Sequence, residues 1–330
     1  MKFDPSKSLS DAEIRDRINA IADGATAGPP HPSLAPSAIR FADPLYTATQ
    51  PLLDVLQHND ETFEFGILDI DVYLRGLRAK EMAVLTAFAH SGKSALLLTS
   101  ICNNSEKRIL FLSLDDPREM VLQKLVCMTH ALKGTDFEKA IRDGDEEWVE
   151  LLRTTPKERF PNLLVSDASM SVDDLPVAIT EATDHWGAPP QCVMLDYVGL
   201  LASRTKSVED GFSSISTRMK ELKGFAKSLP CPLIIVHQGT RGSAKPGTRI
   251  TMTSMAFGGE QEATIVIGLR RKSQDDERDP SERHRLRNTV TVDIPKLKRI
   301  GGRLTGPEGI DLYLDPNNGL IRTLYNADFD

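Results

Sequence analysis

A short apolar segment, MAVLTA at residues 82–87, is followed by FAHSGKS and then by a helical pattern. This order of strand, loop and helix predicts a phosphate-binding loop, in which backbone N–H groups at a helix N-terminus surround the phosphates of a nucleotide. Lys93 would contact the β- and γ-phosphates, and the Ser94 hydroxyl would bind Mg²⁺. The other loop residues predicted to meet the nucleotide are Ala87, His90, Ser91 and Gly92. The motif therefore predicts a site for ATP and Mg²⁺.

Two residues of this loop need separate comment. Ala87 stands where the motif usually has its first glycine. His90 lies inside the loop and could touch a nucleotide, but residues at this position vary in such loops, so we interpret its side chain as a bystander. A chance GKS at a helix start is the alternative interpretation, and the flanking strand and helix argue against it.

Two further apolar segments end in acidic residues. CVMLDY places Asp196 at a strand end, where a carboxylate would hold Mg²⁺ through water. RILFLSL is followed by Asp115, Asp116 and Pro117. We predict that Asp115 orients and deprotonates an attacking water, and that Asp116 caps the helix that begins at Pro117.

Short apolar runs alternate with helical patterns from about residue 62, which predicts an α/β fold with a mostly parallel central sheet flanked by helices. The candidate strands are residues 82–87, 108–114, 162–166, 192–197, 232–238, 263–269, 289–297 and 309–314, and the candidate helices are residues 93–103, 117–132, 172–185 and 212–229. Residues 133–160 are predicted to add one or two short helices. Residues 270–287 mix seven basic with five acidic residues without apolar periodicity, which predicts a mobile solvated loop.

The N-terminal region has a different composition. Ser10 and Glu13 have the spacing of a capping box, and isoleucines follow at helical spacing until Gly24, which predicts a short amphipathic helix. Residues 25–44 contain five prolines, which is typical of a linker or an extended arm. We therefore expect an N-terminal helical and proline-rich arm over residues 1–60 and an ATPase core over residues 61–330.

The composition excludes several classes of protein. The chain has 330 residues, with 40 Lys and Arg against 47 Asp and Glu, so its formal net charge is −7. Its four cysteines form no CxxC pair, which argues against a zinc ribbon and a secreted disulfide scaffold. No apolar run approaches ~18 residues, so we expect a cytoplasmic protein without a membrane contact. An acidic total means that any contact with nucleic acid comes from a local basic patch.

Taken together, residues 62–325 resemble the ATPase core of the DnaB-type replicative helicases, within the RecA-like superfamily of P-loop proteins. The resemblance is carried by ILDIDVYLRGL before the phosphate loop, by AFAHSGKS, and by FLSLDDP where that family reads FSLEM. It continues through MLDYVGLL for DYLQLM, through RMKELKGFAKSLPCPLIIVHQGTR, and through GGEQEAT before an apolar strand. Because only about 60 residues precede the core, we expect no counterpart of the family's N-terminal collar domain.

The resemblance implies further roles. Asp115 falls at the position of the family's catalytic glutamate, and Gln238 at the position that senses the γ-phosphate. Lys296 and Lys298, with Arg299 adjacent, fall where the family has a lysine and an arginine finger that reach into the neighbouring subunit's site. Asp115 is one methylene shorter than glutamate, and Lys298 lacks the planar fork of arginine. The sequence SMAFG replaces the family's Arg-Glu-Ser-Gly loop.

Two loops rich in Gly, Ser and Thr are predicted to face a central channel, because the loops after the fourth and fifth units do so in RecA-like proteins. Their basic residues are Arg204, Lys206, Arg241, Lys245 and Arg249. Such residues on a flexible backbone suit contacts with phosphates and carry no base specificity. We therefore expect binding of single-stranded DNA by a homo-oligomer, either a ring, most simply a hexamer, or a filament.

The leading hypothesis is an oligomeric, Mg²⁺-ATP-dependent helicase motor on single-stranded DNA, as in DNA replication. The alternatives are a recombination or repair ATPase, a DNA-end-processing ATPase with nuclease activity, and a nucleotide-dependent switch without DNA activity. The DNA-end-processing alternative would need metal at Asp115, Asp116 and the acidic residues 275–282. His237 is interpreted as a packed residue at a strand end.

Overall fold

The computed structural model describes residues 45–50, 52–53, 62–202, 211–238, 245–252 and 259–324, without the side chains of 211–214 and 259–260. The chain divides into two compact units, residues 1–53 and 54–330. In the first unit, the described residues include the exposed 3₁₀ turn η1 (Leu45–Ala48). The predicted N-terminal helix and the proline-rich arm before residue 45 lie outside the described residues, and the boundary at residue 60 stays a prediction.

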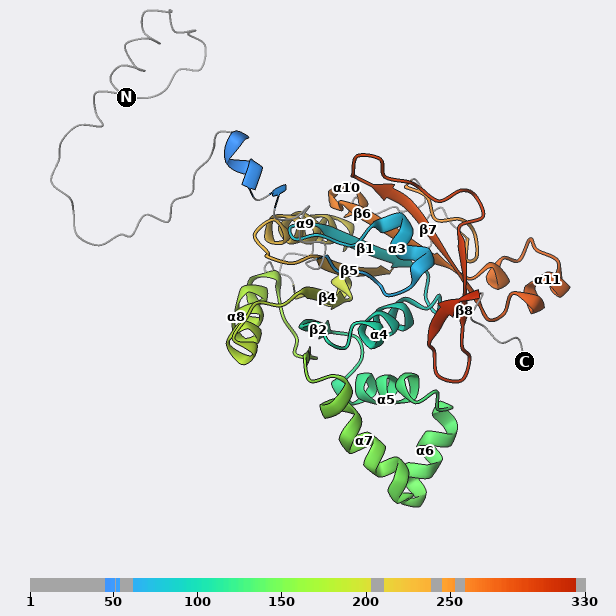
Figure 1. Cartoon of the computed structure of the whole chain (residues 1–330). Helices are drawn as coiled ribbons and strands as arrows, with labels where there is room; N and C mark the ends of the chain where they lie inside the picture. Colours follow the sequence, from blue (N-terminus) through green and yellow to red (C-terminus); the bar gives the residue numbers. More distant parts are fainter. Residues whose placement is uncertain are drawn as a thin grey trace, which may run out of the picture. The chain divides into compact units, whose positions relative to one another are not determined.

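One sheet organises the second unit (Figure 1). In the described residues it has nine strands, in the order β3-β2-β4-β5-β1-β6-β7-β8-β9. The parallel strands are β1 (Met82–Ala87), β2 (Ile109–Ser113), β3 (Leu163–Ser166), β4 (Cys192–Asp196), β5 (Leu233–Gln238) and β6 (Ile265–Arg270). The strands β7 (Thr289–Leu297), β8 (Ile310–Leu314) and β9 (Ile321–Thr323) continue it in antiparallel pairs. The predicted mostly parallel sheet is confirmed, and β9 was not predicted.

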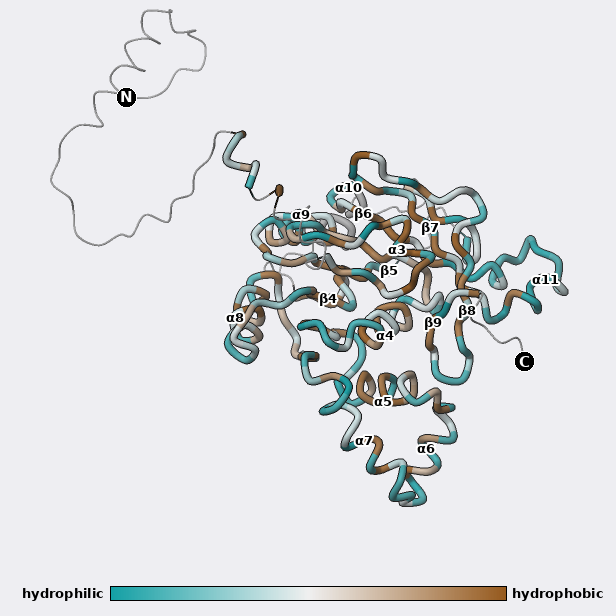
Figure 2. The backbone as a smooth tube through the Cα atoms, viewed as in Figure 1, coloured by the Kyte–Doolittle hydropathy of each residue, from teal (hydrophilic) through white to brown (hydrophobic). Residues whose placement is uncertain are grey.

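Successive residues of each central strand face opposite sides of the sheet and meet different helices. Ala83 and Leu85 of β1 belong to a core that includes residues of α3 (Leu68–Leu74), α4 (Lys93–Asn103) and α5 (Arg118–Thr129). Met82 and Val84 belong to a second core with residues of α8 (Leu175–Trp186) and α9 (Gly211–Ala226). Because both faces are covered, the strands are continuous apolar runs, as Figure 2 shows. This burial is why the strands could be recognised in the sequence.

A helical segment follows β2 and α5, near the lower end of Figure 1. It contains α6 (Gly134–Asp143) and α7 (Glu146–Arg159), so the prediction of one or two helices over residues 133–160 is confirmed with two. Asp145 caps α7 by accepting hydrogen bonds from the N–H groups of residues 147 and 148. Phe137 packs on Trp148, with ring centroids 5.9 Å apart. This small apolar contact holds the two helices together.

The prediction of a mobile solvated loop over residues 270–287 was wrong. The segment includes the end of β6, the turn η5 (Lys272–Gln274) and the short helix α11 (Pro280–Arg285). Arg278 pairs with Glu282 at 2.9 Å, and the Lys272 side chain is 5% exposed. Opposite charges on this segment therefore pair with one another and with the sheet. Across the described residues, no helix is long and apolar enough to cross a membrane.

Candidate nucleotide site

The phosphate-binding loop lies between β1 and α4, as predicted. Gly92 has φ = 95°, a conformation that side-chain-bearing residues rarely adopt, and α4 begins at Lys93. His90 also has a positive φ of 59°. The Ser91 hydroxyl is buried and has no hydrogen-bond partner among the described residues. The loop thus presents the N-terminus of an eleven-residue helix beside a buried polar group.

Lys93 folds back over its own loop. Its Nζ donates hydrogen bonds to the carbonyl oxygens of Phe88 (2.9 Å) and Ala87 (3.2 Å). Burial lowers the pKa of Lys93, while the charges of Asp196 and Asp115 raise it. The loop therefore places a partly buried cation where the sequence predicts contact with the β- and γ-phosphates.

Ser94 and Asp196 meet at the predicted metal position. The Ser94 hydroxyl donates a hydrogen bond of 2.8 Å to Asp196 Oδ2, although the residues are 102 positions apart. Asp196 is 4% exposed and ends β4. Burial raises its pKa, the hydrogen bond from Ser94 lowers it, and the charges of Asp115 and Asp116 raise it. Hydroxyl and carboxylate oxygens are ligands suited to Mg²⁺, so the two residues fit a magnesium site.

These groups line one pocket of about 690 Å³. Its lining residues are Ala89, His90, Gly92, Lys93, Ser94, Ala95, Asp115, Asp116, Lys124, Asp196, Tyr197, Gln238 and Leu314. The pocket unites Asp115 with the phosphate loop because β2 and β4 are parallel neighbours, with Ser113 beside Asp196. Gln238 lies at the end of β5, in register with Ala87. Five lining residues were not predicted from the sequence, namely Ala89, Ala95, Lys124, Tyr197 and Leu314.

Asp116 does not cap the following helix, contrary to the prediction. The helix α5 starts at Arg118, and the Arg118 N–H donates a hydrogen bond of 3.1 Å to Asp167 Oδ2. The Asp116 carboxylate pairs instead with Lys124, with Nζ and Oδ2 2.5 Å apart. His237 is buried, and burial, together with the charge of Lys93, lowers its pKa to about 4. This agrees with its interpretation as a packed residue.

The residues proposed as a finger lie outside this pocket. Lys298 is exposed, and its N–H donates a hydrogen bond to the Thr264 carbonyl oxygen at the edge of the sheet. The Lys296 Nζ donates to the Gln261 carbonyl oxygen at 2.9 Å. Neither lysine lines the pocket described above. The finger role of these lysines therefore stays a prediction.

Arg299 has partners within the chain, which argues against its predicted role as a finger. Its side chain is 5% exposed and pairs with Glu81 through two guanidinium nitrogens, one of them at 2.9 Å. It also donates to the Leu74 carbonyl oxygen. The sequence could not show this pairing, because Glu81 lies 218 positions away.

Arg299→Ala is expected to lower the stability of the core, because it leaves Glu81 without its partner in a mostly buried setting. Breaking a buried pair on one side costs about 3–5 kcal/mol. Lys298→Ala, at the exposed neighbour, is the matched control and leaves the free energy of unfolding nearly unchanged. Urea unfolding of both variants measures this difference. Equal stability of the two variants would contradict the assignment of Arg299 to the core.

Of the predicted DNA-contacting residues, Arg204, Lys206 and Arg241 lie outside the described residues. The exposed Lys245 pairs with Glu277 at 2.6 Å, and this hydrogen bond raises the pKa of Lys245. The Arg249 guanidinium donates to the Thr305 carbonyl oxygen at 2.9 Å. Both cations therefore have partners within the chain.

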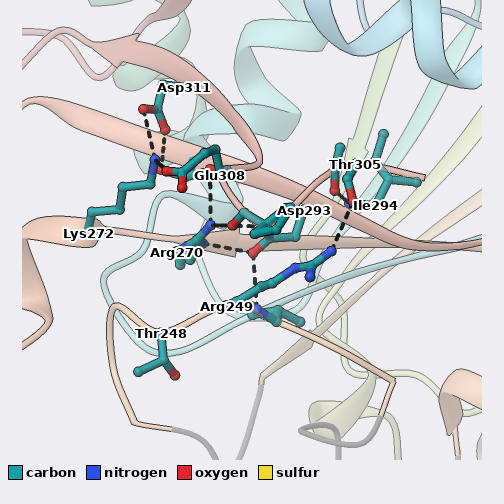
Figure 3. Close-up of polar contacts among 12 residues, drawn as sticks. Thr248, Arg249, Arg270, Lys272, Asp293, Ile294, Thr305, Glu308 and Asp311 are labelled. Carbon is teal, nitrogen blue, oxygen red and sulfur yellow. Dashed lines mark hydrogen bonds and ion pairs between the residues drawn. The ribbon is translucent and has the colours of Figure 1, made fainter. Parts of the chain in front are cut away.

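A buried ion pair fixes the segment that carries Arg249 (Figure 3). Arg270 of β6 and Asp293 of β7 are 5% and 1% exposed, with Nε and Oδ2 2.9 Å apart. The Ile250 N–H donates to the same Asp293 oxygen at 3.0 Å. Arg270 also donates to the carbonyl oxygens of Pro307 and Glu308. One carboxylate thus holds the chain beside Arg249 onto the sheet.

Residues 63–302 match the family described as the DnaB-like helicase C terminal domain. The chain belongs to this family. It is 22% identical over 221 residues to the replicative DNA helicase DnaC of Bacillus subtilis (strain 168), covering 62% of this chain and 46% of that protein. It is 24% identical over 249 residues to the replicative DNA helicase DnaB of Leifsonia xyli subsp. xyli, covering 69% and 52%. The chain thus spans about half the length of these relatives.

Two solved structures share the fold. The first is an isolated ATPase domain, with a TM-score of 0.70 and 20% identity over 86% of this chain and 99% of that one. The second is a DnaB-like replicative helicase studied with primase, with a TM-score of 0.68 and 19% identity over 94% and 72%. The RecA-like α/β fold expected from the resemblance is confirmed.

Proposed function

We propose that this protein is an Mg²⁺-dependent ATPase that works as an oligomeric motor of the DnaB type on single-stranded DNA. The observation that carries the proposal is the convergence of Lys93, the Ser94–Asp196 pair and Asp115 on one pocket. A chance GKS sequence would not bring two separate strand-end acids to the same helix N-terminus. Membership of the helicase family supports the same activity.

Each group has a role in hydrolysis. Lys93 exchanges its loop carbonyls for the β- and γ-phosphate oxygens, and the N–H groups at the start of α4 bind phosphate. Ser94 and Asp196 would hold Mg²⁺, which would supply positive charge against the phosphates. Asp115 orients water and accepts its proton, and Gln238 contacts the γ-phosphate. These roles account for the predicted catalytic and metal-binding residues inside the pocket.

The position of Lys298 favours an oligomer. Its side chain is exposed and does not line the nucleotide pocket of the same chain, so it could reach the pocket of a neighbouring subunit only in an assembly. A cation that acts on a neighbour's γ-phosphate couples hydrolysis to assembly. The family contains ring-shaped replicative helicases, which favours a ring, most simply a hexamer, over a filament. Negative-stain images separate the two, since a closed ring supports the motor and an open filament supports the recombination ATPase.

A nucleotide-dependent switch without DNA activity is the second candidate. It is favoured by one observation, namely that Lys245 and Arg249 already have partners within the chain. Measuring the ATPase rate with and without single-stranded DNA separates the candidates. Stimulation by DNA supports the motor, whereas an ATPase rate that is the same with and without DNA at low salt supports the switch.

Affinity for single-stranded DNA is expected to fall steeply with salt, at ~0.7 log units per log unit of salt for each phosphate neutralised. The double variant Lys245→Ala with Arg249→Ala lacks two such contacts. The slope of log affinity against log salt should therefore become shallower by one to two increments of ~0.7. Poly-dT and mixed sequence should lose affinity alike, because phosphate contacts carry no base code.

Fluorescence-anisotropy titrations at several salt concentrations measure these slopes. Lys139→Ala, an exposed lysine on α6, is the control and should leave the slope unchanged. An unchanged slope in the double variant would remove Lys245 and Arg249 from the DNA contact.

A further inference from the structure

The nucleotide pocket contains one more carboxylate than the proposed chemistry uses. Asp196 has a role toward Mg²⁺ and Asp115 toward water, but Asp116 also lines the pocket. A free carboxylate at that position would repel the phosphates of ATP and compete with them for the metal. The pocket therefore needs a way to neutralise Asp116.

Lys124 meets this need. It lies on α5 and is itself a lining residue, with Nζ 2.5 Å from Asp116 Oδ2. The two side chains are 37% and 24% exposed, so the pair lies at the margin of the pocket and is partly shielded from water. The Ser113 hydroxyl donates to the Asp116 carbonyl oxygen at 2.6 Å, which fixes the backbone that carries the carboxylate.

The net charge of the side chains that line the pocket depends on Lys124. The lining lysines, Lys93 and Lys124, give +2, and the lining aspartates give −3, so their formal sum is −1. Without Lys124 the sum would be −2. The proposed substrate is itself an anion, so each added negative charge at this range lowers its affinity in a partly shielded site.

We propose that Lys124 is a positioning residue of the nucleotide site, which neutralises Asp116 and holds its carboxylate away from the metal and the phosphates. Of the two aspartates that follow β2, Asp115 then acts on water, because Asp116 is paired with Lys124. This inference rests on the proposed ATPase function. The opposing idea is that Lys124 leaves Asp116 and contacts the phosphates itself.

Binding of a non-hydrolysable ATP analogue with Mg²⁺ tests the inference on the full chain. Lys124→Met keeps the length of the side chain and removes its charge, and should weaken binding about tenfold at low salt. Asp116→Asn removes a negative charge and leaves Lys124 unpaired, so it should bind at least as tightly as wild type. The double variant Asp116→Asn with Lys124→Met should bind within about twofold of wild type, because no uncompensated carboxylate remains.

Two further variants serve as controls. Lys124→Arg keeps the charge and should retain most of the affinity. Lys133→Met removes a lysine from an exposed pair with Asp136, at 4.0 Å and outside the pocket, and should change nothing. Added salt should narrow the gap between Lys124→Met and wild type.

Two results would overturn the inference while the wild type binds nucleotide. One is a double variant as weak as Lys124→Met, which would make Lys124 a direct phosphate contact. The other is Lys124→Met with wild-type affinity. A wild-type protein that binds no nucleotide would overturn the proposed ATPase function and this inference together.

Discussion

Lys93→Ala is expected to abolish ATP hydrolysis and to weaken nucleotide binding strongly. The substitution removes the charge that meets the β- and γ-phosphates at the N-terminus of α4. The fold should survive, because among the described residues the Lys93 side chain donates its hydrogen bonds to two carbonyl oxygens of its own loop. Steady-state ATPase assays and circular dichroism together measure both expectations.

The matched control is Lys139→Ala, which removes the same charge from the exposed surface of α6. It should hydrolyse ATP at the wild-type rate. A Lys93→Ala protein with a normal circular dichroism spectrum and at least half of the wild-type turnover would refute the phosphate-loop assignment.

Asp115→Asn is expected to slow hydrolysis by ~10²-fold or more, the usual scale for the loss of a general base. Nucleotide binding should stay nearly intact, because the asparagine keeps the shape of the side chain and removes a negative charge from the pocket. Single-turnover assays separate the chemical step from binding and product release.

Asp116→Asn is the natural comparison, since it makes the same change one residue later. Its effect on turnover should be much smaller, because the Asp116 carboxylate is held by Lys124. If Asp116→Asn were the slower enzyme, the catalytic acid would be Asp116, and the assignment of this strand end would be wrong by one residue.

The parallel strands and the phosphate loop could be predicted because their signals are local. A strand buried on both faces is an apolar run, and the glycine at a positive φ lies next to the lysine that it positions. The same reasoning missed β9, which is three residues long. It also failed at Asp116, whose partner is set by the path of α5 past the end of β2.

Charged residues were the main source of error, because charge alone does not reveal a partner. Lys272 looked like part of a solvated loop, yet it is buried and pairs with Asp311 of β8 at 2.9 Å. Arg299 looked like a free cation beside Lys298, yet Glu81 binds it from a distant part of the chain. Such pairs depend on the order of the strands in the whole sheet, which local sequence patterns do not show.

The hydrogen bonds that Lys93 and Ser94 make within the chain affect which ligands can bind the phosphate loop. Lys93 and Ser94 already have oxygen partners within the chain, so a ligand must replace those partners before it gains anything from these side chains. A neutral nucleoside has no group that can outcompete two carbonyls and a carboxylate, whereas a triphosphate with its metal offers charge to both side chains at once. We therefore expect compounds without phosphate to bind the pocket weakly, even where the rest of their shape fits it.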